Sequence, residues 1–233
     1  MSQNGVNTAK HPGRGAFVLF EGVDRCGKTT QSQRLVQHLK GKGVDAELWR
    51  FPDRFTAIGR MIDSYLTGET DTDDAAVHLL FSANRWEKRE AMLAALRAGR
   101  TLIVDRYAYS GAAFTAAKNL PGLDLEWCKA PDKGLPAPDA VIFLAMTPEA
   151  AALRGGYGNE RYEKEEMQRE VARQFHLLAD DRWQTVDAAR SVEDVEAEVR
   201  RIAEDAVACC LEGAPLRVLW AGDRTLQHLF SSP

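Results

Sequence analysis

One stretch near the start of the chain has the spacing of a phosphate-binding loop. Gly22-Val23-Asp24-Arg25-Cys26-Gly27-Lys28-Thr29 fits the pattern G-x-x-x-x-G-K-[ST]. In that pattern the glycines let backbone N–H groups face a phosphate chain, the lysine reaches the β- and γ-phosphates, and the hydroxyl suits Mg²⁺. The apolar run Ala16–Phe20 precedes the loop and the amphipathic stretch Thr29–Lys40 follows it, as the motif requires. The sequence therefore predicts a nucleoside triphosphate site, in which Cys26 is a small loop residue and not a nucleophile.

A phosphate-binding loop leaves two classes of protein open. A kinase passes the γ-phosphoryl group to a small acceptor, whereas a GTPase or ATPase switch works by binding partners. The chain has no N-K-x-D or T-K-x-D motif for guanine. A kinase should also carry arginines and a base-stacking aromatic near the carboxyl ends of its strands, because ligands of parallel sheets bind there.

Residues of those types stand at the expected places. Phe51-Pro52-Asp53-Arg54 follows one apolar run, and Asp105-Arg106-Tyr107 ends another. Phe81 and Arg85 are four residues apart in a helical stretch, so they share one face. An aromatic face with one hydrogen-bonding arginine reads a flat base, and cations are needed where two phosphate groups meet.

The elements that must position these residues alternate along the chain. The runs Ala16–Phe20, Ala46–Arg50, Thr101–Asp105, Ala140–Met146 and Trp183–Asp187 are typical of strands buried on both faces. Helices are predicted over Thr29–Lys40, over the stripe Ile58–Leu66, over about Asp73–Ala98, and from starts at Pro148 and Ser191. This alternation predicts an α/β three-layer sandwich, a mostly parallel five-stranded sheet with helices on both faces.

The chain shows no repeat or linker that would divide it. We predict a single domain over residues 16–220, with a glycine-rich lid at about 154–162, a flexible N-terminal tail (1–15) and a C-terminal tail (221–233). The first fifteen residues have no apolar h-region, so we interpret them as a tail, with an organellar transit peptide as the alternative.

The composition excludes several classes of protein. Thirty Lys and Arg against 34 Asp and Glu leave a net charge of −4, which argues against a protein that works on duplex nucleic acid. The four cysteines form no C-x-x-C pair and the five histidines are scattered, so neither a zinc site nor a disulfide scaffold is indicated. We expect small-molecule substrates, no nucleic-acid or membrane partner, and a cytoplasmic location, with an organellar or nuclear pool left open.

The order of these motifs resembles the thymidylate kinase family of P-loop nucleoside monophosphate kinases, in its eukaryotic type. The matching stretches are FEGVDRCGKTTQ, FPDRFTAIGRMIDSYL, VHLLFSANRWE, VDRYAYSGAAFTAAK, LEWCKAPDKGLPAPD, RGGYGNERYE and VDAARSVEDV. The likeness runs from about Ala16 to Trp220 and departs at both ends and around Pro121–Leu123. It implies the P-loop kinase fold, ATP-dependent conversion of dTMP to dTDP with Mg²⁺, and a homodimer built on helices.

The resemblance also implies site residues. The implied substrate-binding set is Asp24, Phe51, Arg54, Phe81, Arg85, Arg106, Phe114 and Tyr162. For the base, Phe81 stacks on thymine, Arg85 donates to a base carbonyl and Phe114 closes the pocket. For the rest of the nucleotide, Asp24 accepts from the sugar 3′-hydroxyl, Arg54 and Arg106 clamp the monophosphate, and Tyr162 crowds the 2′ position of a ribose. The ATP-binding set is Gly22, Asp24, Arg25, Cys26, Gly27, Lys28, Thr29, Thr30, Arg154 and Arg190. Thr29 and Asp105 are the metal residues, and Arg25, Lys28, Asp105 and Arg106 the catalytic ones.

Three questions stay open at this stage. The acceptor is dTMP, or else another pyrimidine deoxynucleotide or deoxynucleoside. The alternative outside the enzymes is a nucleotide-dependent switch whose acceptor pocket is vestigial. The catalytic cation is Arg25, or else Arg154 or Arg161 in the lid. The stripe Ile58–Leu66 is either core or dimer interface.

Overall fold

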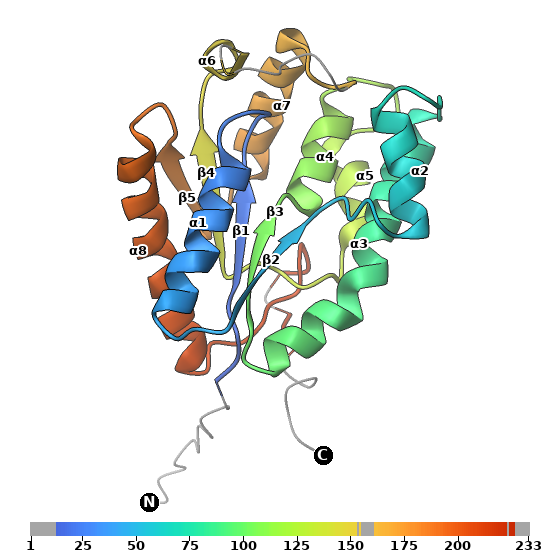
Figure 1. Ribbon diagram of the computed structural model, residues 1–233. Coiled ribbons are helices and arrows are strands. Elements are labelled where there is room, and N and C mark those ends of the chain that lie inside the picture. The colour runs from blue at the N-terminus through green and yellow to red at the C-terminus, as the bar shows by residue number, and fades with distance from the viewer. Residues whose placement is uncertain (1–12, 153, 155–160, 223, 227–233) are drawn as a thin grey trace, which may run out of the picture.

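A five-stranded parallel sheet lies at the centre of the molecule (Figure 1). The computed structural model describes residues 13–152, 154, 161–222 and 224–226. The strands are β1 (Phe17–Glu21), β2 (Ala46–Arg50), β3 (Thr101–Asp105), β4 (Ala140–Ala145) and β5 (Trp183–Asp187), in the order β2-β3-β1-β4-β5. Each neighbouring pair is parallel, with Val18 of β1 beside Ile103 of β3 and Ala140 of β4. The predicted sheet is confirmed, and every strand bound is within one residue of its prediction.

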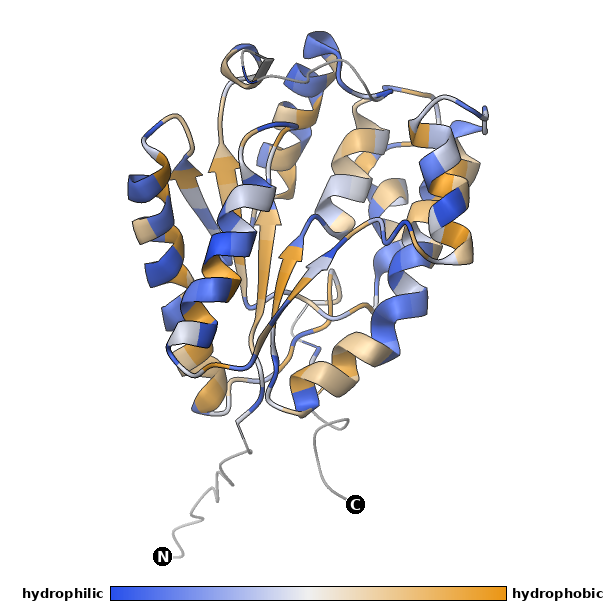
Figure 2. Ribbon diagram, in the orientation of Figure 1, coloured by the Kyte–Doolittle hydropathy of each residue, from blue (hydrophilic) through white to orange (hydrophobic). Residues whose placement is uncertain are grey.

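Helices cover both faces of the sheet and leave their polar sides outward (Figure 2). Because strand side chains alternate, Phe17 and Leu19 pack on one face and Val18 and Phe20 on the other. The second face carries α1 (Lys28–Gly41) and α8 (Val192–Leu211). The first carries α3 (Asp74–Arg97), α4 (Ala108–Ala116), α5 (Leu125–Lys129) and α7 (Glu165–Leu178). The elements α2 (Ala57–Leu66), α6 (Pro148–Ala152) and the three-residue turn η1 (Ala130–Asp132) complete the fold.

The helix starts follow the local signals in the sequence. Asp73 caps α3 by accepting from the N–H groups of Ala75 and Ala76, and Ser191 caps α8 by accepting from the N–H of Asp194. Both starts were predicted from residue type and spacing, and both are confirmed. Within the predicted stripe Ile62 is fully buried, whereas Met61 is 56 % exposed.

The described chain extends beyond residues 16–220 at both ends. Arg14 is buried and forms an ion pair with Asp139 at the start of β4. The N–H of Leu226 donates to the carbonyl of Leu216 at 2.8 Å, and Leu226 packs into the core. Residues 1–12 and 227–233 lie outside the described residues. Among those described, no helix combines the length and the apolar character that crossing a membrane requires.

Candidate active site

The phosphate-binding loop joins β1 to α1 and depends on two glycines. Gly22 has φ +145° and Gly27 has φ +104°, backbone conformations that side chains disfavour. A Cβ on Gly22 would also lie 2.7 Å from the carbonyl oxygen of Leu144 and 2.8 Å from Sγ of Cys26. Gly27 is the N-cap of α1, so the loop leads directly into the positive end of that helix.

Lys28, Thr29 and Asp105 meet at the end of the loop. Nζ of Lys28 donates to the carbonyls of Gly22 (3.1 Å) and Val23 (2.7 Å). The hydroxyl of Thr29 donates to Oδ2 of Asp105 at 2.8 Å. Asp105 is 2 % exposed, and its Oδ1 has no hydrogen-bond partner among the described residues. A buried carboxylate oxygen that still needs a partner, beside a hydroxyl oxygen, has the donor chemistry that Mg²⁺ prefers.

A hollow opens above this loop. It is lined by Asp24, Arg25, Gly27, Lys28, Thr29, Thr30, Arg50, Asp105, Arg106, Arg154 and Glu163. Nε of Arg25 donates to Glu163 at 2.9 Å, and Arg25 adopts φ +64°. Arg154 donates to the carbonyls of Arg25 (3.4 Å) and Ala188 (3.0 Å). The hollow thus gathers cations beside the loop that is predicted to hold the triphosphate.

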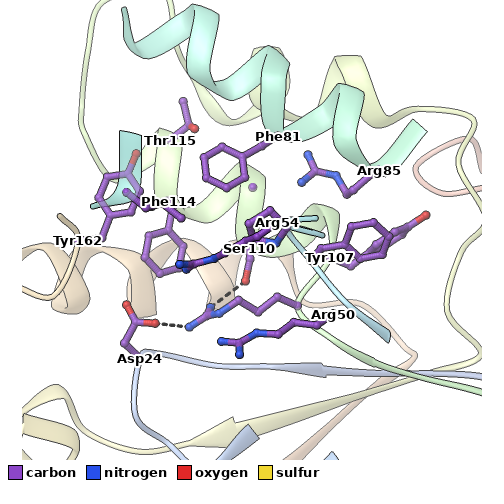
Figure 3. A pocket seen from close by; sticks show the side chains of 15 residues that line it. Asp24, Arg50, Arg54, Phe81, Arg85, Tyr107, Ser110, Phe114, Thr115 and Tyr162 are labelled. Carbon is purple, nitrogen blue, oxygen red and sulfur yellow. Dashed lines mark hydrogen bonds and ion pairs between the residues drawn. The ribbon is translucent and has the colours of Figure 1, made fainter. Parts of the chain in front are cut away.

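A second pocket adjoins the hollow, and all of the predicted substrate-binding residues line it (Figure 3). Its lining is Asp24, Arg50, Phe51, Pro52, Arg54, Leu66, Phe81, Arg85, Arg106, Tyr107, Ser110, Gly111, Phe114, Thr115 and Tyr162. Asp24, Arg50 and Arg106 line both the pocket and the hollow. A group bound in the pocket would therefore meet a group bound on the loop at these three side chains.

Arg106 stands at this junction and is held by a network of hydrogen bonds. Its Nη1 donates to Oγ of Ser110 at 3.0 Å, and its Nη2 forms an ion pair with Asp24. Oγ of Ser110 donates to the carboxylate of Glu21 at 2.5 Å, and Glu21 also accepts from the N–H groups of Tyr107 and Ser110. Complete burial raises the pKa of Glu21 above its usual range.

The carboxylate of Asp24 is oriented from the opposite side by α7. Nε2 of Gln168 donates to Oδ2 of Asp24 at 2.7 Å and to the carbonyl of Tyr162 at 2.9 Å. Oε1 of Gln168 accepts from the N–H of Asp24 at 2.9 Å. Gln168 thus connects the phosphate loop to the chain segment that precedes α7.

The far end of the pocket is aromatic and closed. Phe81 comes from α3 and is half-buried, and Phe114 comes from α4 (Figure 3). The rings of Phe114 and Tyr162 lie 5.5 Å apart, and the hydroxyl of Tyr162 donates to that of Tyr65 at 3.1 Å. Arg85 is 2 % exposed and forms an ion pair with Asp132.

Some residues singled out in the sequence do not line either cavity in the part of the chain that the structure describes. Arg190 forms an ion pair with Glu198 on α8 and does not line either cavity of the described chain. Cys26 is buried in the core below the loop, and Gly22 contributes backbone only. Arg161 is bound to the end of α2 and the segment after it, since it donates to the carbonyl of Tyr65 and pairs with Asp71 at 2.8 Å. Residues 155–160, most of the predicted lid, lie outside the described residues.

Sequence reasoning missed several residues at the site. Arg50 ends β2 at the carboxyl edge of the sheet, and this position was a usable signal. Glu21 ends β1 at the same edge and carried the same signal. Ser110, Asp132 and Gln168 had no such signal, because their partners are distant in the sequence and only packing brings them together.

Comparison with known proteins gives one consistent result. A family model described as "Thymidylate kinase" matches residues 20–199. The chain is 52 % identical to a thymidylate kinase of Arabidopsis thaliana, over 89 % of this chain and 78 % of that protein. It is 50 % identical to the human thymidylate kinase, over 89 % of this chain and 98 % of that protein. A solved structure of thymidylate kinase from Candida albicans is similar with a TM-score of 0.80 and 36 % identity, covering 88 % of this chain and 98 % of that one.

Proposed function

This chain belongs to the thymidylate kinase family and transfers a phosphoryl group from ATP to dTMP, and we propose that the two adjoining cavities are the sites of these two substrates. The observation that carries the proposal is the shared lining. Asp24, Arg50 and Arg106 border both the loop hollow and the aromatic pocket. A triphosphate on the loop and a monophosphate in the pocket would meet there with their charges neutralised.

In the acceptor pocket the base and the monophosphate of dTMP bind at different ends. Thymine lies on Phe81 with Phe114 closing the pocket, and Arg85 donates to a base carbonyl. Arg54 and Arg106 hold the monophosphate, and Asp24 accepts from the sugar hydroxyl. Since Gln168 and Arg106 already orient the Asp24 carboxylate, the acceptor is positioned with little rearrangement.

On the donor side Lys28 exchanges its bonds to the loop carbonyls for phosphate oxygens. Arg25 supplies charge to the group in transfer, and Arg154 lies behind it against the loop. Thr29 and Asp105 are the residues that would hold Mg²⁺, directly or through water. The metal would neutralise the phosphate oxygens as negative charge shifts between them. The protein residues do little covalent chemistry, and positioning and electrostatics supply the catalysis.

We place the dimer contact on the outer surface of α2 and α3. Phe55, just before α2, is 92 % exposed, Met61 on α2 is 56 % exposed, and Leu79 on α3 is 48 % exposed. The helices α2 and α3 pack against each other, and large exposed apolar side chains that form a patch are typical of interaction sites. Sedimentation of the wild type and of the double variant Met61→Glu/Leu79→Glu tests this dimer contact, and an unchanged mass for the double variant would refute it.

The domain bounds, the lid and the cytoplasmic location stay predictions of the sequence.

A coupled assay of ADP release tests the reaction and its alternatives. We expect turnover with ATP and dTMP and none with thymidine, because the pocket has arginines for a monophosphate; dUMP is the third acceptor assayed. Slow ATP hydrolysis without transfer to any of the three would favour a nucleotide switch. Preference for thymidine would instead indicate a deoxynucleoside kinase.

A further inference from the structure

Arg85 lies at the closed end of the aromatic pocket as one half of a buried ion pair. Arg85 is 2 % exposed and its partner Asp132 is fully buried. Nε of Arg85 donates to Oδ1 of Asp132 at 3.0 Å, and Nη2 donates to Oδ2 at 2.6 Å. Two parallel bonds between a planar guanidinium and a planar carboxylate fix the direction of both groups.

Asp132 is itself held in place by α3. Oγ of Ser82 donates to Oδ1 of Asp132 at 2.8 Å. One turn along the helix, Nε1 of Trp86 donates to the carbonyl of Pro131 at 2.7 Å. The short turn η1 is therefore fastened to the same helix face that carries Arg85, and the carboxylate has little freedom to turn.

The backbone of α4 limits Arg85 on another side. A Cβ added at Gly111 would lie 2.8 Å from Nη2 and 3.1 Å from Nη1 of Arg85. Only a glycine leaves room for the guanidinium at this distance. The remaining nitrogen, Nη1, makes no hydrogen bond to any described residue, and Arg85 lines the pocket.

We propose that Asp132 sets the base specificity of the pocket by fixing Arg85 so that only its Nη1 edge is offered to the base. The inference rests on the proposed placement of thymine in this pocket. A guanidinium donates and never accepts, so the fixed Nη1 can donate to O4 of thymine, on the base edge remote from the sugar, but cannot bond the 4-amino group of cytosine, which is also a donor. Asp132 acts through Arg85 and is a positioning residue.

The test compares binding of dTMP with binding of the 5-methyl-2-pyrimidinone deoxyribonucleotide, an analogue that lacks O4 and, with it, the N3 proton. Calorimetry gives Kd for both with no need for turnover, so the reaction assay decides the proposed function separately. We expect the wild type to prefer dTMP by at least about 100-fold, because a site built to bond a substrate oxygen rejects its absence strongly. In Asp132→Asn the preference for dTMP should fall below about tenfold, mainly because the Kd for dTMP rises while the Kd for the analogue changes little.

Two further variants separate positioning from stability. Asp139→Asn breaks the ion pair of Arg14, which is also largely shielded from solvent (4 % and 14 % exposed) but lies away from the pocket, and it should keep the full preference for dTMP. Gly111→Ala leaves Asp132 intact and displaces the guanidinium, so it should lose the preference even if Asp132→Asn does not fold. The inference is overturned if the wild type shows no preference, if Asp132→Asn or Gly111→Ala retains it, or if Asp139→Asn loses it equally.

Discussion

Replacing Arg25 with alanine should lower kcat by at least about 100-fold, because we propose that Arg25 supplies charge to the phosphoryl group in transfer. An arginine in that role contributes about 10³–10⁵-fold. We set the minimum expected loss below this range, since Lys28, Arg106 and Arg154 line the same hollow and compensate in part. A 100-fold loss corresponds to about 2.7 kcal/mol of transition-state stabilisation. Arg25 adopts φ +64°, and alanine carries the same Cβ, so the backbone strain is equal in both proteins and only the side chain is tested.

Initial rates at varied ATP and dTMP give the two KM values and kcat. Both KM values should change little, because an interaction made mainly in the transition state affects kcat. Arg154→Ala is the comparison variant, and it should lower kcat less than Arg25→Ala does. A near-normal kcat for Arg25→Ala would make Arg25 an ordinary loop charge. A raised KM for ATP with an intact kcat would make it a ground-state phosphate ligand, and either result would move the catalytic cation to Arg154.

Three further predictions concern the base, the metal and pH. Phe81→Ala should raise KM for dTMP by the equivalent of about 1–3 kcal/mol while KM for ATP stays unchanged, because we propose that the side chain stacks on the base; equal changes in both KM values would mean that Phe81 is a core residue. Asp105→Asn should raise the Mg²⁺ concentration for half-maximal activity by about 10–100-fold, and a normal titration curve would count against the metal assignment. Burial lowers the pKa of His78 to about 4, whereas the ordinary value that applies in the unfolded chain is 6.5. As the pH falls below 6.5, the unfolded chain binds a proton that the folded protein does not, so the folded protein loses stability toward pH 4. Denaturant unfolding at pH 7 and pH 5 should show about 2 kcal/mol less stability at pH 5 from this group, and the same loss in His78→Gln would refute the assignment.

The sequence by itself determined the elements and the phosphate loop, because their signals are local. Short continuous apolar runs indicated the buried strands and one-sided apolar stripes indicated the helices, and all five predicted strands are present within one residue. Asp73 and Ser191 cap helices through N–H groups two or three residues away. Gly27 must adopt a positive φ to begin α1 after the loop, and the motif specifies that glycine directly.

Only the tertiary structure decided which charged side chains pair. Gln168 reaches Asp24 across 144 residues, and Asp132 reaches Arg85 across 47. Arg161 and Arg154 look alike in the sequence, yet Arg161 is bound to Asp71 beyond α2 and Arg154 lies against the phosphate loop. A charged residue has the same sequence signature whether it is solvated or buried in a pair. The packing of α3, α4 and α7 on the sheet removes water from some of these groups, and a buried charge must then find its partner there.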